Sequence, residues 1–113
     1  IVVEGILDAI SISGFAVMHN KISDEQSQQL KQLHKKVIVV PDHDEAGLKI
    51  IDDALDNSFS VSIPEWENES VKDVNDAVIK YGRVATLVKI LEYTYDSSIK
   101  IKLAKKALEH KLK

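Results

Sequence analysis

The sequence predicts an α/β protein in which a four-stranded parallel sheet is flanked by helices. Short apolar runs alternate with stretches of helical spacing, which is the pattern of strand–helix–strand crossovers in a parallel sheet. The run VIVV at 37–40 is entirely β-branched, which favours a strand covered on both faces. The 113 residues suit one domain, and a hydrophobic content of 44% is typical of a globular protein with a modest core.

The N-terminal end of the chain predicts a strand, a helix and a second strand. Residues 1–3 are apolar up to Glu4, and residues 6–13 then have helical spacing until Gly14 ends the helix. The short apolar run at 15–18 is the second expected strand.

A capping-box pattern marks the start of the next helix. Ser23 is followed three residues later by Gln26, and the mostly polar segment 24–35 is expected to lie on the surface with light packing. A basic cluster follows at its end, formed by Lys31, His34, Lys35 and Lys36. Such a cluster can contact a nucleic-acid backbone, but lysines at a helix C-terminus are also favoured by the helix dipole, and we prefer this second reading.

Prolines end the last two predicted strands. The strand at 37–40 stops at Pro41, because proline cannot donate a ladder hydrogen bond. Residues 45–55 repeat apolar side chains at spacings of three and four, as in an amphipathic helix. Residues 59–63 then alternate as a fourth strand, which ends at Pro64.

The C-terminal part of the chain is helical by its pattern. Helices are expected at 74–82, 83–95 and 99–113, and we divide the chain into a domain at 1–82 and a helical extension at 83–113. The last helix has an apolar stripe of Ile101, Ala104, Leu108 and Leu112. We expect this stripe to pack on the domain with the lysines outward, in preference to nucleic-acid binding or docking onto a neighbouring module.

Charge and composition exclude several classes of protein. The net charge is −3, but residues 1–96 carry 17 acidic and nine basic side chains, whereas residues 97–113 carry six lysines and one glutamate. The absence of cysteine excludes a disulfide framework, a zinc ribbon and a thiolate nucleophile. No apolar run approaches the roughly 20 residues that cross a bilayer, so a cytoplasmic protein is expected. The chain starts within a strand at Ile1, which suggests a piece of a larger protein.

Acidic side chains follow the first and third predicted strands. Glu4 ends the first strand, and Asp42 and Asp44 follow the third. Ligands of parallel sheets bind at the carboxyl ends of the strands, so these acids converge if the two strands are neighbours. Three carboxylates repel one another unless a cation neutralises them, and Mg²⁺ and Mn²⁺ prefer such oxygen ligands.

Each acid also has a purely structural interpretation. Asp42 or Asp44 alone suits a helix N-cap, because a carboxylate there accepts from a free backbone N–H. Gly47 favours a functional interpretation of these acids. A glycine inside a helix is roughly 1 kcal/mol less favourable than alanine, so its presence indicates that another group approaches the helix closely at this position. Trp66, which lies among glutamates, is interpreted as a residue that pins its loop onto the domain.

Three motifs resemble the Toprim domain, the metal-binding catalytic module of bacterial and phage-type primases, topoisomerases and several nucleases. They are E-G-x-x-D-A at Glu4–Ala9, D-x-D-E-A-G at Asp42–Gly47 and K-D-x-N-D at Lys72–Asp76. The resemblance covers roughly residues 1 to 80, and the last two motifs resemble the primase branch. Topoisomerases and small Toprim nucleases often have an arginine soon after the glycine, and residues 48–55 contain none.

The resemblance implies a role for each acidic position. Asp42 and Asp44 are implied as the main metal ligands and as catalytic residues. Glu4 is implied as a catalytic acid of the metal site, to which a general acid/base role is sometimes assigned. The remaining implied site residues are Asp8 and Asp73 on the acidic rim and Lys72 and Asn75 at the nucleotide phosphate. The structural alternatives are an exposed first-turn acid for Asp8, a helix cap for Asp73 and a solvated side chain for Lys72.

The implied activity is that of a DNA primase, which synthesises RNA primers on single-stranded DNA by Mg²⁺- or Mn²⁺-dependent nucleotidyl transfer. The fragment alone is not expected to be fully active. The implied partners are the template, nucleoside triphosphates and a replicative helicase, fused or separate, in a bacterial or phage-infected cell. One alternative is a Toprim nuclease or topoisomerase fragment. A more remote alternative is a phospho-receiver domain, which expects its acidic pair after the first strand and five βα units.

Overall fold

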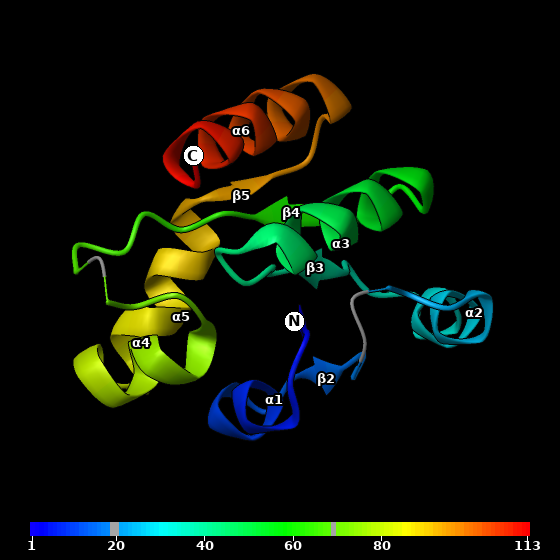
Figure 1. Cartoon of the computed structure of the whole chain (residues 1–113). Coiled ribbons are helices and arrows are strands. Elements are labelled where there is room, and N and C mark those ends of the chain that lie inside the picture. The colour runs from blue at the N-terminus through cyan, green and yellow to red at the C-terminus, as the bar shows by residue number, and fades with distance from the viewer. Residues whose placement is uncertain (19–20, 69) are drawn as a thin grey trace.

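The computed structural model describes residues 1–18, 21–68 and 70–113, and in them a five-stranded, mostly parallel sheet is flanked by six helices (Figure 1). The strands are β1 (Val2–Val3), β2 (Phe15–Ala16), β3 (Ile38–Val39), β4 (Ser60–Ser62) and β5 (Thr94–Tyr95). The helices are α1 (Ile6–Ile12), α2 (Asp24–Gln32), α3 (Glu45–Asp56), α4 (Val74–Tyr81), α5 (Arg83–Glu92) and α6 (Ser98–Lys111).

The strand order is β2-β1-β3-β4-β5, and only the β4–β5 pair is antiparallel among the pairs that the structure describes. Val2 is in register with Val39 and Val39 with Val61, so β1 and β3 are direct neighbours. The four predicted parallel strands and the α/β class are confirmed. Because β1 and β3 adjoin, the loops that follow them leave the sheet side by side.

The prediction that 83–95 is one continuous helix is wrong. Helix α5 ends at Glu92, and Thr94 and Tyr95 pair with Ser62 and Val61 as a fifth strand. The Ile63 backbone N–H donates to the Tyr93 carbonyl at 3.2 Å, which continues this contact. Threonine and tyrosine both suit a strand. The edge of β4 offers them backbone hydrogen-bond partners, which would stay unpaired if α5 continued through these residues.

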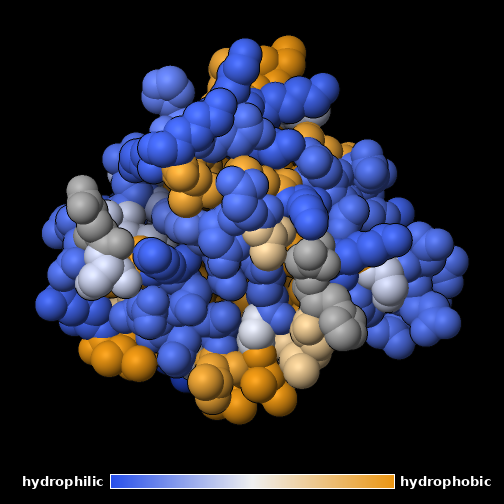
Figure 2. Space-filling model, in the orientation of Figure 1, coloured by the Kyte–Doolittle hydropathy of each residue, from blue (hydrophilic) through white to orange (hydrophobic). Residues whose placement is uncertain are grey.

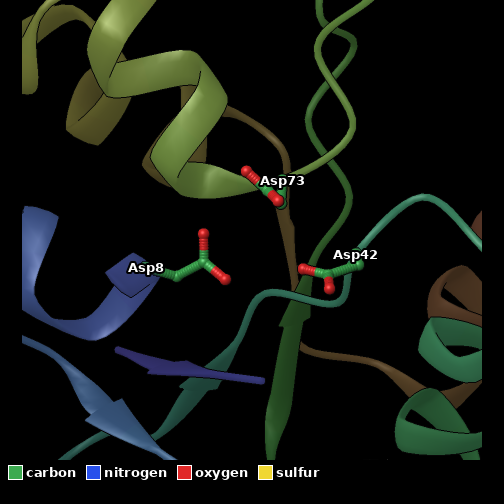
Figure 3. A group of neighbouring side chains, drawn as sticks. All are labelled: Asp8, Asp42 and Asp73. Carbon is green, nitrogen blue, oxygen red and sulfur yellow. The ribbon is translucent and has the colours of Figure 1, made fainter. Parts of the chain in front are cut away.

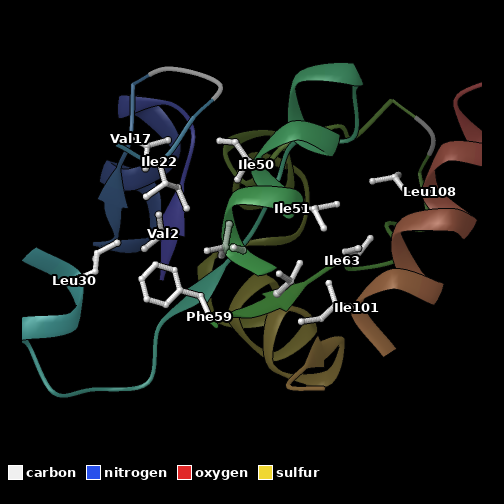
Figure 4. Packing of buried hydrophobic residues seen from close by; sticks show 13 residues of the cluster. Val2, Val17, Ile22, Leu30, Ile50, Ile51, Phe59, Ile63, Ile101 and Leu108 are labelled. Carbon is white, nitrogen blue, oxygen red and sulfur yellow. The ribbon is translucent and has the colours of Figure 1, made fainter. Parts of the chain in front are cut away.

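The sheet is buried on both faces, as the β-branched run at 37–40 predicts. Val39 belongs to the core beneath α3 and α6, whereas Ile38 and Val40 belong to the core beneath α1, α4 and α5. Val2 and Val3 divide between the same two cores. The first core also contains Leu30 of α2 and is shown in Figure 4.

Helix α6 packs through its predicted stripe. Ile101 and Leu108 are buried in the first core, and Ala104 and Leu112 pack against it while partly exposed. The packing interpretation of this basic helix is therefore confirmed, with Lys105 paired to Asp52 of α3 at 2.7 Å. The residues after 82 thus add β5 and α6 to the same sheet and core as the residues before it.

Much of the surface is hydrophilic, and an apolar patch lies at the lower edge of the view in Figure 2, in the region of α1. Ile6, Leu7 and Ile10 of α1 are all exposed. Among the described residues, no helix combines the length and the apolar character needed to cross a membrane.

Candidate metal centre

The carboxyl ends of β1 and β3 bring the first two motifs into direct contact. Glu4 follows β1, and one of its carboxylate oxygens accepts a hydrogen bond of 2.6 Å from the backbone N–H of Asp42, just after β3. The neighbouring Val40 N–H donates to the Val2 carbonyl at 2.8 Å. The adjacency of these strands therefore places Glu4 against the D-x-D loop, as the metal hypothesis requires.

Three carboxylates from separate segments form an acidic group among the described residues, shown in Figure 3. One oxygen each of Asp8, Asp42 and Asp73 lies within 4.8 Å of the others. Asp8 comes from the first turn of α1, Asp42 from the loop after β3, and Asp73 from the N-cap of α4. The first-turn interpretation of Asp8 as an exposed acid is wrong, because this residue is only 5% exposed.

Two of the predicted ligands are also helix caps. Asp44 accepts a hydrogen bond of 2.8 Å from the Gly47 N–H at the start of α3, and Asp73 accepts one of 2.8 Å from the Asp76 N–H at the start of α4. Both capping interpretations are confirmed. A capped carboxylate retains lone pairs, so capping is compatible with metal binding. Asp44 is exposed and stands outside the group of Asp8, Asp42 and Asp73, although its charge acts on Glu4 and Asp42.

Asn75 fixes the position of Asp8. Its backbone N–H donates to the Asp8 carboxylate at 2.7 Å, and its side-chain oxygen accepts from the Ser11 hydroxyl at 2.7 Å. These two hydrogen bonds join the start of α4 to α1, two helices that are more than 60 residues apart in the sequence. Ser11 carries no signal in the sequence, because a serine inside a helix is ordinarily solvated or bonded to its own helix.

Gly47 confirms the predicted close approach. A Cβ atom at this position would lie 1.9 Å from the carbonyl oxygen of Asp42. Helix α3 therefore starts with its backbone against the D-x-D loop, and no larger residue fits without moving that loop. This contact sets the position of Asp42 relative to the cap formed by Asp44.

The pKa values of three acids at the site are raised, as expected when burial and mutual repulsion act on carboxylates without a neutralising cation. Burial, followed by the charge of Glu4, raises the pKa of Asp42 from 3.8 to about 8. Burial also raises the pKa of Glu4 and of Asp8, although each accepts a backbone hydrogen bond that favours its charged form. Carboxylate oxygens are the ligands that Mg²⁺ and Mn²⁺ prefer, so the donor set fits a divalent metal held by Asp8, Asp42 and Asp73.

The raised pKa of Asp42 predicts that the metal-free protein loses stability as the pH rises. Between pH 3.8 and about 8 the folded protein retains a proton at Asp42 that the unfolded chain has released, so folding becomes less favourable across this range. In thermal unfolding with EDTA, we expect a lower midpoint at about pH 8 than at about pH 5. Saturating Mg²⁺ should raise the midpoint more at the higher pH, because the metal competes with the proton.

The Asp42→Asn variant is the control for this pH dependence. It removes the titrating carboxyl and should flatten the slope of the midpoint against pH, although Glu4 and Asp8 retain part of it. A variant whose slope equals that of the wild type would contradict the assignment.

The third motif contacts the second through the backbone. The His43 N–H donates to the Lys72 carbonyl at 2.8 Å, and the Lys72 N–H donates to the Asp76 carboxylate at 3.3 Å. The Lys72 side chain is exposed. Sequence reasoning did not single out His43, whose ring stacks on Trp66 with centroids 6.2 Å apart. Trp66 is partly buried against the second core, so its interpretation as a loop-pinning residue is confirmed.

The basic cluster before β3 makes internal contacts. Lys36 pairs with Asp96 at 3.0 Å, and the Lys31 ammonium lies 6.0 Å from the centre of the Phe59 ring. These contacts lie at residues next to the amino end of β3, away from the acidic group at its carboxyl end. They support the structural interpretation of the cluster over a nucleic-acid contact.

The fold and site define an α/β domain with a group of carboxylates at the carboxyl edge of its sheet, and this donor set fits a divalent metal. A family model described as Toprim-like matches residues 1–78, and the chain belongs to this family. The chain has no significant match among curated proteins or solved structures. Toprim domains are typically catalytic and bind divalent metals through acidic residues, which indicates metal-dependent chemistry related to nucleotidyl transfer. The phospho-receiver hypothesis receives no support from this match.

Proposed function

We propose that the chain is the catalytic domain of a DNA primase, which synthesises RNA primers on single-stranded DNA by nucleotidyl transfer. The observation that carries the proposal is that Asp73 of the K-D-x-N-D motif lies beside Asp8 and Asp42. The motif that resembles the primase branch is thus part of the acidic group itself. The contact between His43 and Lys72 joins the same two segments.

The chain's own residues have distinct roles in this proposal. A bound Mg²⁺ or Mn²⁺ would supply the positive charge that lowers the pKa of the attacking hydroxyl and stabilises the leaving pyrophosphate. Asp8, Asp42 and Asp73 hold it, and Asp44 adds charge while capping α3. Glu4 holds the D-x-D loop through the Asp42 N–H, and burial raises its pKa above the usual value, which favours a role in proton exchange.

The reaction forms one bond and breaks another. The 3′-hydroxyl oxygen of the growing strand bonds to the α-phosphorus of a nucleoside triphosphate, its proton passes to a base, and pyrophosphate leaves. Lys72 precedes Asp73 in the chain and its side chain is exposed, which supports its proposed contact with a phosphate. A replicative helicase, fused or separate, is the partner that would deliver single-stranded template.

Primer extension tests this function. With a short RNA annealed to a DNA template, nucleoside triphosphates and Mn²⁺, we expect the chain to incorporate labelled nucleotide. The double variant Asp42→Asn, Asp44→Asn should lose at least about 100-fold of this activity, because it removes two carboxylates from the site. The matched control is Asp56→Asn, which replaces an exposed acid at the other end of α3, the helix that Asp44 caps. This variant should keep full activity.

A related Toprim activity would contradict the primase assignment. Metal-dependent nicking of plasmid DNA without nucleotide incorporation would indicate a nuclease, and relaxation of supercoils would indicate a topoisomerase. Either result, lost in the double variant, would retain the metal centre and replace the proposed reaction.

A further inference from the structure

A cavity of about 470 Å³ lies beside the acidic group, between the D-x-D loop, the loop before α4 and the C-terminal end of α6. His43, Trp66, Lys72 and Lys111 are among its lining residues. A smaller cavity of about 80 Å³ shares His43 and Lys111 with it. The larger volume is within the range of sites that bind small organic ligands.

The charge of the cavity favours an anion. Lys72 and Lys111 come from different segments, and neither forms an ion pair with the other residues that the structure describes. The described lining contains no carboxylate. Two ammonium groups at one cavity whose described lining contains no carboxylate attract phosphate oxygens.

The remaining lining favours a planar group next to that anion. Trp66 and His43 stack with an interplanar angle of 30°, so the cavity has an aromatic wall. The Nε2 atom of His43 is buried without a hydrogen-bond partner among the described residues. Asn68 adds an amide to the lining. Aromatic faces bind nucleobases by stacking, so the combination of these groups with lysines suits a nucleotide.

The position of the cavity connects it with the metal centre. His43 stands between Asp42 and Asp44 in the chain, and its N–H is bonded to the Lys72 carbonyl at 2.8 Å. Lys111 lies outside the matched residues 1–78, so the last turn of α6 completes this cavity from a part of the chain beyond the family match.

We propose that this cavity binds a nucleoside triphosphate, with Lys72 and Lys111 contacting its phosphates and the wall of Trp66 and His43 flanking its base. The choice of ligand rests on the proposed function, in which nucleoside triphosphates are substrates. The role of α6 is to supply the second ammonium group.

Fluorescence of Trp66 tests the proposal directly, because it is the single tryptophan of the chain. With EDTA present, titration with ATP should change this fluorescence saturably, and adenosine without phosphates should not. Lys111→Gln should weaken ATP binding by about three- to tenfold, as expected for one lost charge-assisted contact. Lys102→Gln removes an exposed lysine of the same helix that does not line the cavity, and it should bind ATP like the wild type.

Three competing results overturn the proposal. The first is no saturable change with ATP, and the second is equal ATP affinity in the Lys111→Gln and Lys102→Gln variants. The third is a single-stranded oligonucleotide that binds and depends on Lys111 while ATP does not, which would assign the cavity to a strand. Displacement of ATP by tripolyphosphate would support the proposal, because it would show that contacts to the phosphates are sufficient for binding.

The outcome is separable from that of the proposed function. If ATP binding in EDTA depends on Lys111 but primer extension is absent, the cavity assignment stands and the primase assignment falls. If primer extension requires Asp42 and Asp44 but Lys111→Gln leaves ATP binding unchanged, the primase assignment stands and the cavity assignment falls.

Discussion

Replacing Asp42 and Asp44 by asparagine is expected to abolish tight binding of divalent cations while leaving the fold intact. The change removes two negative charges from a site in which Asp42 lies within 4.8 Å of Asp8 and Asp73. Asparagine caps helices as well as aspartate does, so the start of α3 keeps its hydrogen bond from Gly47. The Mn²⁺ affinity measured by calorimetry should fall by at least about 100-fold.

The Asp56→Asn variant is again the control, because it removes an exposed charge from the other end of α3. Its Mn²⁺ affinity should equal that of the wild type. If the double variant and this control bind Mn²⁺ equally well, the acidic group is not the metal site.

Replacing Gly47 by alanine is expected to have the largest effect on stability among the glycine-to-alanine changes of the chain. The new Cβ would meet the carbonyl oxygen of Asp42 at 1.9 Å. The backbone fixes the position of a Cβ atom, and the oxygen is a backbone atom, so no side-chain rotation relieves the clash. The free energy of unfolding should fall by about 3 kcal/mol or more, because overpacking against backbone is relieved only by moving the loop. Denaturant unfolding measures this loss, and Mn²⁺ titration of the folded fraction should show weakened binding.

Gly82→Ala is the matched control for this substitution. Gly82 has a φ of 89°, and apart from its chain neighbours no atom of the described residues lies within 4 Å of the added Cβ, so its cost is backbone strain of about 1–3 kcal/mol without a clash. Its Mn²⁺ affinity should be unchanged, since Gly82 lies at the far end of α4 from Asp73. A Gly47→Ala protein with wild-type stability and metal affinity would contradict the described contact.

The parallel sheet was predictable because its strands have a strong local signal. The β-branched run at 37–40 divides its side chains between two cores, as a strand covered on both faces must. Strand β5 was not predictable in the same way. It has only two residues, which continue the helical pattern of α5, and its strand conformation comes from pairing with the edge of β4.

The candidate site was predictable where it follows from strand order. Neighbouring parallel strands bring Glu4 to the D-x-D loop, and a 2.6 Å hydrogen bond joins them. The burial of Asp8 was not predictable, because an acid in the first turn of a helix is ordinarily favoured by the dipole in solvent. It depends on α4 packing against α1 through Asn75, a tertiary contact without a local pattern.

A crystal structure of the chain with Mn²⁺, analysed by anomalous scattering, tests the metal centre most directly. The site predicts an anomalous peak among the carboxylates of Asp8, Asp42 and Asp73, and this peak should be absent in the Asp42→Asn, Asp44→Asn variant. A Mn²⁺ ion bound elsewhere on the molecule, with no peak between these three side chains, would contradict the account.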